Sequence, residues 1–136
     1  MSKQIYNLDG ILTDWDLRGH VNFNGRPRSK LHLQTRELLK ELFPTSRILE
    51  EVDIPVRRGQ ILYLDFYVLS NSMAVEVHGE QHYSYSSLFH GSKKDLLLQK
   101  KRDNEKAEWC EINGIKLVVL PFNEDINEWT NRIKTV

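Results

Sequence analysis

Three side chains in the middle of the chain have the types and spacing that metal-dependent chemistry requires. Asp65 lies on one hydrophobic run, and Glu76 and His78 lie on the next, with the polar segment Ser70-Asn71-Ser72 between them. Side chains alternate across a strand, so Glu76 and His78 share one face. If the two runs pair as a hairpin, Asp65 comes beside Glu76. Two adjacent carboxylates repel each other, and a hard divalent cation such as Mg2+ usually neutralises them.

The segment after the second run adds two more polar side chains. Gly79-Glu80-Gln81-His82 places an amide and a second histidine just past the predicted strand end. The alternation alone fits equally well a polar strand face that meets water. The added amide and imidazole favour a functional site.

The spacing of these residues resembles that of the PD-(D/E)XK nuclease superfamily, with His78 where the usual lysine stands. The run His78 to His82, with Lys101-Arg102-Asp103 downstream, is more similar to the very-short-patch-repair-like branch. That branch includes phage-borne homing endonucleases of the EDxHD type. The resemblance covers about Lys30 to Pro121. It implies a restriction-endonuclease-like α/β sandwich and a DNA endonuclease that uses Mg2+, with Mn2+ as a candidate substitute.

Phosphodiester hydrolysis requires neutralised charge, a stabilised leaving oxygen and a deprotonated water. We expect Asp65 to be the primary Mg2+ ligand, with Glu76 and the backbone carbonyl of Val77 as further ligands. His78 or His82 is the expected general base or stabiliser of developing charge, because histidine titrates near neutral pH.

Gln81 is expected to orient the water or the scissile phosphate. A zinc site made by Glu76, His78 and His82 is the competing metal interpretation. It matches fewer residues than the Mg2+ site does.

A long helix is predicted from Asp95 to Asn113, and its helical wheel places an acid on the inward stripe. That stripe contains Leu96, Asp103, Ala107 and Cys110. A buried lone carboxylate is costly, so Asp103 needs a partner, which His78 or His82 would supply. Lys106, almost one turn further on, either replaces the missing strand lysine or pairs with Asp103.

Another helix is predicted from Lys30 to Phe43. In the resembled family this first helix usually brings a carboxylate to the metal site. Gln34 or Thr35 aligns with that position and Glu37 narrowly misses it, so the helix-borne acid stays open. His32, at the edge of the apolar stripe, is a candidate inward polar group, although such a histidine is more often structural.

The remaining elements complete an α/β fold. A strand is predicted from Ile48 to Ile54, followed by a turn over Pro55 to Gln60. The apolar run Ile115 to Leu120 is typical of a strand buried on both faces, and Asn123 is the predicted cap of a last helix. Strand, crossover helix and strand form a parallel unit. The expected architecture is a central mixed sheet with a hairpin, flanked by helices.

The 136 residues fit a single nuclease domain spanning 1–136, in which 1–29 is a less regular N-terminal element and a candidate for DNA contact. Lys plus Arg and Asp plus Glu both number 19, so DNA binding requires locally grouped cations. The candidate nucleic-acid-binding residues are Arg26, Arg28, Lys30, Arg57, Arg58, Lys93 and Lys94. Solvated loop or turn residues are the competing interpretation of these cations.

The preferred function is therefore a metal-dependent endonuclease on double-stranded DNA, site-specific in the homing or mismatch-nicking manner. The alternatives are a structure-specific repair or recombination nuclease, and a catalytically inactive DNA-binding or assembly module on a nuclease fold. A homodimer would suit cutting both strands. No run approaches the roughly 20 apolar residues of a membrane helix. The single Cys110 fits a reducing cytoplasm, bacterial or phage-infected.

Overall fold

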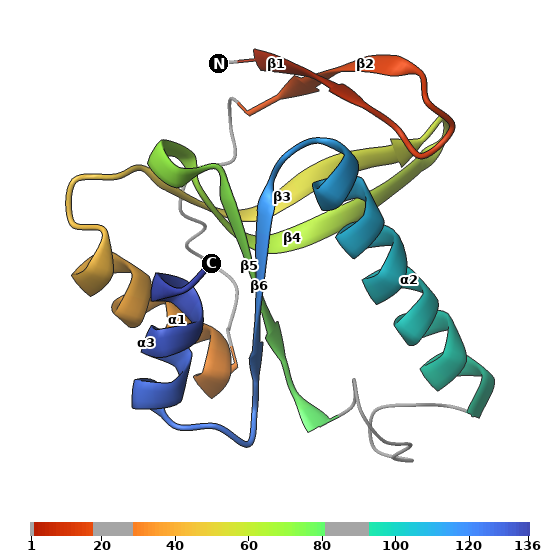
Figure 1. Cartoon of the computed structure of the whole chain (residues 1–136). Helices are drawn as coiled ribbons and strands as arrows, with labels where there is room; N and C mark the ends of the chain where they lie inside the picture. Colours follow the sequence, from red (N-terminus) through yellow and green to blue (C-terminus); the bar gives the residue numbers. More distant parts are fainter. Residues whose placement is uncertain (1, 18–28, 81–92) are drawn as a thin grey trace.

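The structure of the chain, a computed structural model, describes residues 2–17, 29–80 and 93–136 (Figure 1). Its elements in chain order are β1 (Ser2–Tyr6), β2 (Leu12–Asp16), α1 (Lys30–Leu42), β3 (Ile48–Arg57), β4 (Gln60–Val68), the 3-10 helix η1 (Leu69–Asn71), β5 (Met73–His78), α2 (Lys93–Ile112), β6 (Lys116–Pro121) and α3 (Ile126–Lys134). Four candidate site residues, Arg26, Arg28, Gln81 and His82, lie outside the described ranges.

The main sheet contains four strands in the order β3-β4-β5-β6. The β3/β4 and β4/β5 pairs are antiparallel, and the β5/β6 pair is parallel. Because α2 connects β5 to β6, these elements form the predicted strand-helix-strand unit. The predicted α/β class, with a mixed sheet, a hairpin and flanking helices, is confirmed.

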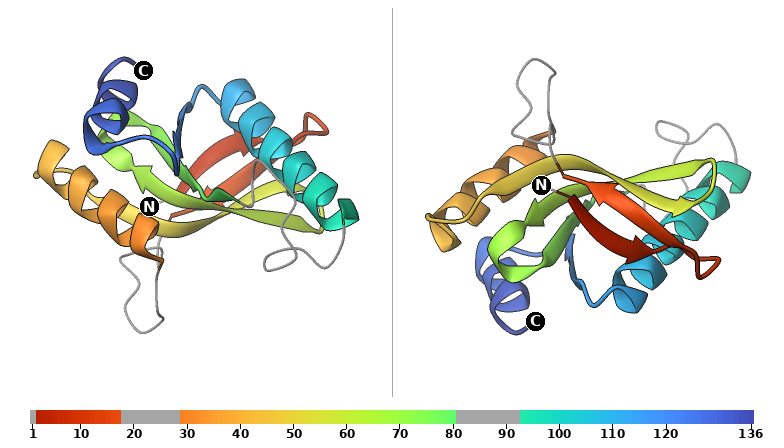
Figure 2. Two further views of the ribbon diagram at one scale, coloured as in Figure 1. Left: turned by 90° about the horizontal axis from the view of Figure 1, so that it is seen from below. Right: turned by 90° about the horizontal axis from the view of Figure 1, so that it is seen from above.

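Helices cover both faces of this sheet (Figure 2). One face packs against α1 and α3 in a core of Leu38, Leu39, Phe66, Val68, Met73, Val75, Val118, Leu120, Trp129 and Ile133. The other face packs against α2 and the N-terminal strands in a second core that includes Leu49, Val52, Tyr67, Ala74, Trp109 and Cys110. The sheet is therefore the middle layer, and side chains on β4 and β5 are positioned from both sides.

The N-terminal segment is more regular than predicted. β1 and β2 form an antiparallel two-stranded sheet, whereas the sequence predicted only a less regular element over 1–29. The indole of Trp15 packs edge-on against Tyr67 and Trp109, with ring centroids 5.1 and 5.0 Å apart. Its Nε1 donates to the carbonyl of Asp53 at 2.7 Å. These contacts attach the hairpin to the main core.

Several predicted boundaries differ from the structure, and the predicted turn over Pro55 to Gln60 is reduced to Arg58 and Gly59, the residues between β3 and β4. β3 continues past Ile54 to Arg57, because β3 is an edge strand, where proline is tolerated, and Pro55 pairs with Ile61. The N-cap of α3 is Asp125 and not Asn123. The Asp125 carboxylate accepts a hydrogen bond from the backbone N–H of Glu128 at 2.8 Å.

The predicted inward stripe of α2 is only partly correct. Ala107 is exposed, Leu96 and Asp103 are half-buried, and Cys110 is buried. The buried residues of α2 are Glu105, Trp109 and Cys110. Charged residues of α2 are distributed around the whole helix, so its sequence defines no sharp apolar face. Among the described helices, none is long and apolar enough to cross a membrane.

The first turn of α1 depends on Ser29, whose hydroxyl accepts a hydrogen bond from the backbone N–H of His32 at 3.1 Å. Ser29→Ala leaves that N–H without its cap, and we expect it to lower the free energy of unfolding by about 1 kcal/mol. Urea unfolding checks this, with Thr45→Ala in the exposed loop after α1 as the control. Equal stability of the two variants would contradict the capping role.

Candidate active site

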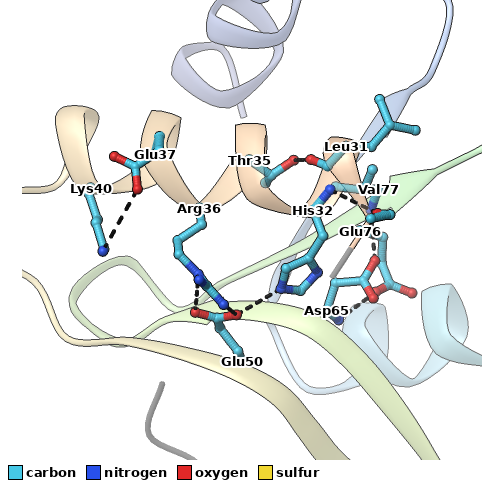
Figure 3. Close-up of polar contacts among 11 residues, drawn as sticks. Leu31, His32, Thr35, Arg36, Glu37, Lys40, Glu50, Asp65, Glu76 and Val77 are labelled. Carbon is cyan, nitrogen blue, oxygen red and sulfur yellow. Dashed lines mark hydrogen bonds and ion pairs between the residues drawn. The ribbon is translucent and has the colours of Figure 1, made fainter. Parts of the chain in front are cut away.

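Asp65 on β4 and Glu76 on β5 lie side by side, as the predicted hairpin requires (Figure 3). The regular pairing of β4 with β5 ends at Phe66 and Val75. Beyond that pair, the backbone N–H of Asp65 donates to Glu76 Oε2 at 2.7 Å, and the backbone N–H of Val77 donates to Asp65 Oδ2 at 2.8 Å. Each carboxylate thus accepts an N–H from the opposite strand. The two acids are fixed by the backbone.

β3, the other strand that pairs with β4, is also irregular beside Asp65. Glu50 pairs with Phe66 and Val52 pairs with Leu64, whereas Glu51, opposite Asp65, is missing from the regular register. The φ angle of Glu51 is +50°. A left-handed backbone is uncommon for residues other than glycine and costs roughly 1–3 kcal/mol. Local distortion therefore flanks Asp65, as is common at functional sites.

Lys106 on α2 supplies a positive charge to this pair of acids. Its Nζ lies 2.8 Å from Glu76 Oε1, and the Glu76 side chain is only 2% exposed. Burial opposes the charged lysine, but the Glu76 charge outweighs it and raises the pKa of Lys106. The sequence predicts that Lys106 either replaces the missing strand lysine or pairs with Asp103, whereas the direct ion pair of its ammonium is with Glu76.

The carboxyl of Asp65 has a pKa well above its ordinary value. Burial is the main cause, and repulsion by the Glu76 charge adds to it. The N–H of Val77 and the ammonium of Lys106 act in the opposite direction without cancelling the shift. A further cation beside Asp65 would therefore stabilise its ionised form.

The donor atoms here fit a hard cation better than zinc. Carboxylate oxygens of Asp65 and Glu76, with the main-chain oxygen of Val77, are the ligand type that Mg2+ prefers, and Mg2+ usually keeps several waters. Among the residues that the structure describes, no group of three or more His, Cys, Asp or Glu side chains could hold a metal ion. The zinc interpretation needs three such side chains, and one of them, His82, lies outside the described ranges.

A pocket of about 580 Å³ opens beside the two acids. Its described lining residues are Ser29, Leu31, His32, Asp65, Glu76, Val77, Gly79, Glu80, Gln99, Lys106 and Phe122. They come from the start of α1, from β4, from the end of β5, from α2 and from the segment after β6. The site is therefore an assembled concave surface, as ligand-binding sites usually are.

His78 and Asp103 lie near each other, as predicted. His78 Nε2 is 4.0 Å from Asp103 Oδ1, and the His78 side chain is 11% exposed. Asp103 is half-buried on α2. His78 belongs to the same strand as Glu76 but is absent from the described lining of the pocket.

The question of a helix-borne acid is answered by the described pocket lining, which includes neither Gln34 nor Thr35 nor Glu37. Gln34 is exposed, and the Thr35 hydroxyl donates to the carbonyl of Leu31 at 2.8 Å. Glu37 lies on the solvent side, 3.9 Å from Lys40 Nζ. The helix instead contributes His32, which the sequence marked only as an inward polar group.

Sequence reasoning missed the partner of His32. His32 Nε2 lies 2.7 Å from Glu50 Oε1, and Arg36 holds both Glu50 oxygens at 2.9 and 2.8 Å (Figure 3). Burial would raise the pKa of Glu50, but the hydrogen bonds from Arg36 and His32 outweigh it and lower that pKa. The available signal was the acid at position 50, which falls on the same alternating positions as the apolar Ile48, Val52 and Ile54.

The candidate DNA-binding cations that the structure describes are of two kinds. Lys30, Arg58, Lys93 and Lys94 are exposed. Arg57 is instead bonded to Glu105 on α2, with Asp9 3.8 Å from its Nε. Arg57 therefore connects the end of β3 to α2 and to the N-terminal hairpin.

No family model matches this chain, and no solved structure matches it. It is similar to the uncharacterized protein 094L of Frog virus 3 (isolate Goorha), at 40% identity over 77 residues, 55% of this chain and 50% of that protein. It is also similar to the uncharacterized protein 033L of Invertebrate iridescent virus 3, at 30% identity over 70 residues, 52% of this chain and 36% of that protein. Protein 307L of Invertebrate iridescent virus 6 is 33% identical over 61 residues, 45% of this chain and 31% of that protein. The match thus spans half or less of each viral relative.

Proposed function

We propose that this chain is a metal-dependent DNA endonuclease that hydrolyses phosphodiester bonds. The observation that carries the proposal is the reciprocal bonding of Asp65 and Glu76, with Lys106 on Glu76, at the wall of an open pocket. Two acids fixed by strand backbone suit a hard cation. A nearby ammonium suits the charge that develops on a reacting phosphate. The resemblance to PD-(D/E)XK nucleases rests on the same two acids, together with His78.

The residues of the pocket have distinct roles in this proposal. Asp65 and Glu76, with the carbonyl of Val77, would hold Mg2+ or Mn2+. When bound, such an ion neutralises phosphate charge and makes a water molecule more acidic. Lys106 keeps the Glu76 carboxylate in place and adds positive charge. His78, positioned beside Asp103, adds an imidazole next to the pair.

Gln81 and His82 lie outside the described ranges. Gln81 is proposed to orient the water or the phosphate. His82 remains a second candidate imidazole. Both roles rest on the sequence motif that they share with His78.

The proposed substrate is double-stranded DNA, cut at a specific site in the homing or mismatch-nicking manner. The chain has no net charge, so binding would depend on local cations. Lys30 adjoins Ser29 at the pocket, and Lys93 and Lys94 begin α2, whose Lys106 lines it. We propose the same DNA-binding role for Arg26, Arg28 and Arg58. A homodimer would place two such sites on opposite strands.

A catalytically inactive DNA-binding module is the second candidate. The direct ion pair between Lys106 and Glu76 favours it, because the ammonium already neutralises one of the two acids. The raised pKa of Asp65 argues the other way, since one ammonium does not compensate both carboxylates.

Supercoiled plasmid and phage or host DNA, incubated with purified protein in Mg2+, Mn2+ or EDTA, distinguish these functions. The nuclease proposal predicts nicked or linear products in Mg2+ and Mn2+ and none in EDTA. Gel-shift binding to the same DNA in EDTA is measured in parallel. Binding without cleavage in every metal would reject the nuclease and support the binding module.

A further inference from the structure

Of the described residues that line the pocket, His32 is the one histidine. It lies at the start of α1, and its side chain is 10% exposed. Glu50, its partner through Nε2, is 1% exposed. A buried carboxylate and an imidazole are thus paired at the wall of the site that contains Asp65 and Glu76.

The charge state of Glu50 determines which nitrogen of His32 carries the proton. Arg36 bonds to both Glu50 oxygens, and the pKa of Glu50 is lowered despite its burial. An ionised carboxylate only accepts hydrogen bonds, so His32 Nε2 must donate. The neutral imidazole then carries its lone pair on Nδ1. Within residues 2–17, 29–80 and 93–136, Nδ1 has no hydrogen-bond partner.

The ring is also held in place by packing. It stacks on Phe66, with ring centroids 4.5 Å apart and an angle of 28° between the planes. Phe66 directly follows Asp65 on β4. A residue whose ring is fixed by stacking and by a bonded carboxylate needs little reorganisation to act as a base.

We propose that His32 accepts a proton, through Nδ1, from the water that attacks the phosphodiester, and that Glu50 and Arg36 are its positioning residues. The inference rests on the proposed nuclease function. The water gives one proton to Nδ1 while its oxygen bonds to phosphorus. The bond from phosphorus to the leaving oxygen breaks, and that oxygen takes a proton from solvent. His32 then returns its proton to solvent, and α1 supplies an imidazole where the family resemblance implied a carboxylate.

The tautomer is measured independently of activity. In nitrogen-15 NMR spectra at pH 8, the neutral His32 ring is expected to be protonated at Nε2, with the signals assigned by their loss in His32→Gln. A ring protonated at Nδ1 would overturn the proposal, because that nitrogen would have no lone pair for a proton.

Cleavage kinetics test the proton transfer. His32→Gln keeps an amide that can donate to Glu50 but has no basic nitrogen, and it should cut on the order of 10²-fold more slowly with little change in DNA binding. His32→Ala should lose as much and regain rate with added imidazole. Glu50→Gln should be slower than wild type but faster than His32→Gln. Glu37→Gln, on the solvent side of the same helix, is the matched control and should cut at the wild-type rate.

Thermal unfolding establishes that each variant is folded. Wild-type cleavage by His32→Gln would overturn the role of His32 and leave the nuclease proposal standing. A slow His32→Ala that imidazole does not restore would also overturn it. Absence of cleavage by the wild-type protein in every metal would instead reject the nuclease function, and the proton transfer with it.

Discussion

Asp65→Asn is expected to abolish metal-dependent cleavage and, at the same time, to stabilise the metal-free protein. The amide keeps an oxygen that can accept the Val77 N–H bond, so the local backbone is preserved. It removes the charge needed to hold a cation. Metal ligation contributes several kcal/mol to such reactions, so we expect a rate loss on the order of 10³-fold or more.

The gain in stability follows from the raised pKa of Asp65. Between the unfolded pKa near 3.8 and the higher folded pKa, the folded protein binds more protons than the unfolded chain. The contribution of this group to stability therefore falls as the pH rises through that window. Above the window, the ionised carboxylate beside Glu76 destabilises the fold, and the amide removes this cost.

Thermal unfolding in EDTA at pH 8 should show this gain. A stabilisation of about 1 kcal/mol corresponds to a Tm rise of about 4 °C for a chain of this length. Asp14→Asn, on the exposed side of β2, is the control and should change neither Tm nor cleavage. Added Mg2+ should raise the Tm of the wild type more than that of Asp65→Asn. A less stable or fully active Asp65→Asn would contradict the assignment.

Lys106→Met is expected to be strongly destabilising in EDTA. Glu76 is 2% exposed and Lys106 17% exposed, so the methionine leaves a buried carboxylate without its ion partner. Removing one partner of a buried ion pair costs roughly 3–5 kcal/mol. Mg2+ should recover part of this loss, because a bound cation supplies the missing positive charge.

Urea unfolding of Lys106→Met, Glu76→Gln and the double variant measures the pair itself. The double variant should be less destabilised than the sum of the single ones, by about 1–3 kcal/mol. Lys100→Met, at an exposed position on the same helix, is the matched control. Additive effects, or a Lys106→Met as stable as the control, would show that the ion pair contributes little.

The local parts of this site were predictable from sequence. Alternation along two strands placed Asp65 opposite Glu76, because a short hairpin leaves little choice of partner. The apolar run before Pro121 predicted β6. Together with the predicted helix before it, this run also predicted the parallel unit of β5, α2 and β6. These inferences depend on neighbours in the chain.

The contacts between distant segments were not predictable in the same way. His32 and Glu50 are 18 residues apart, and their bond forms only because α1 packs across β3 and β4. The hairpin of β1 and β2 depends on Trp15 meeting Tyr67 and Trp109, which lie far along the chain.

The face of α2 was mispredicted for a related reason. Its packing is concentrated near Trp109 and Cys110, and Glu105 is buried by its bond to Arg57. Hydrophobic periodicity alone does not record such ion pairs. Ala107 therefore matched the predicted stripe and is nevertheless exposed.

The central claim is that Asp65 and Glu76 form a metal-dependent centre for phosphodiester hydrolysis. The most direct test is the initial rate of plasmid nicking as Mg2+ is titrated, with wild type and Asp65→Asn compared side by side. The account predicts a rate that saturates with Mg2+ and vanishes in EDTA for the wild type, and background nicking for Asp65→Asn throughout. Nicking that is independent of Mg2+, or equal in the two proteins, would contradict it.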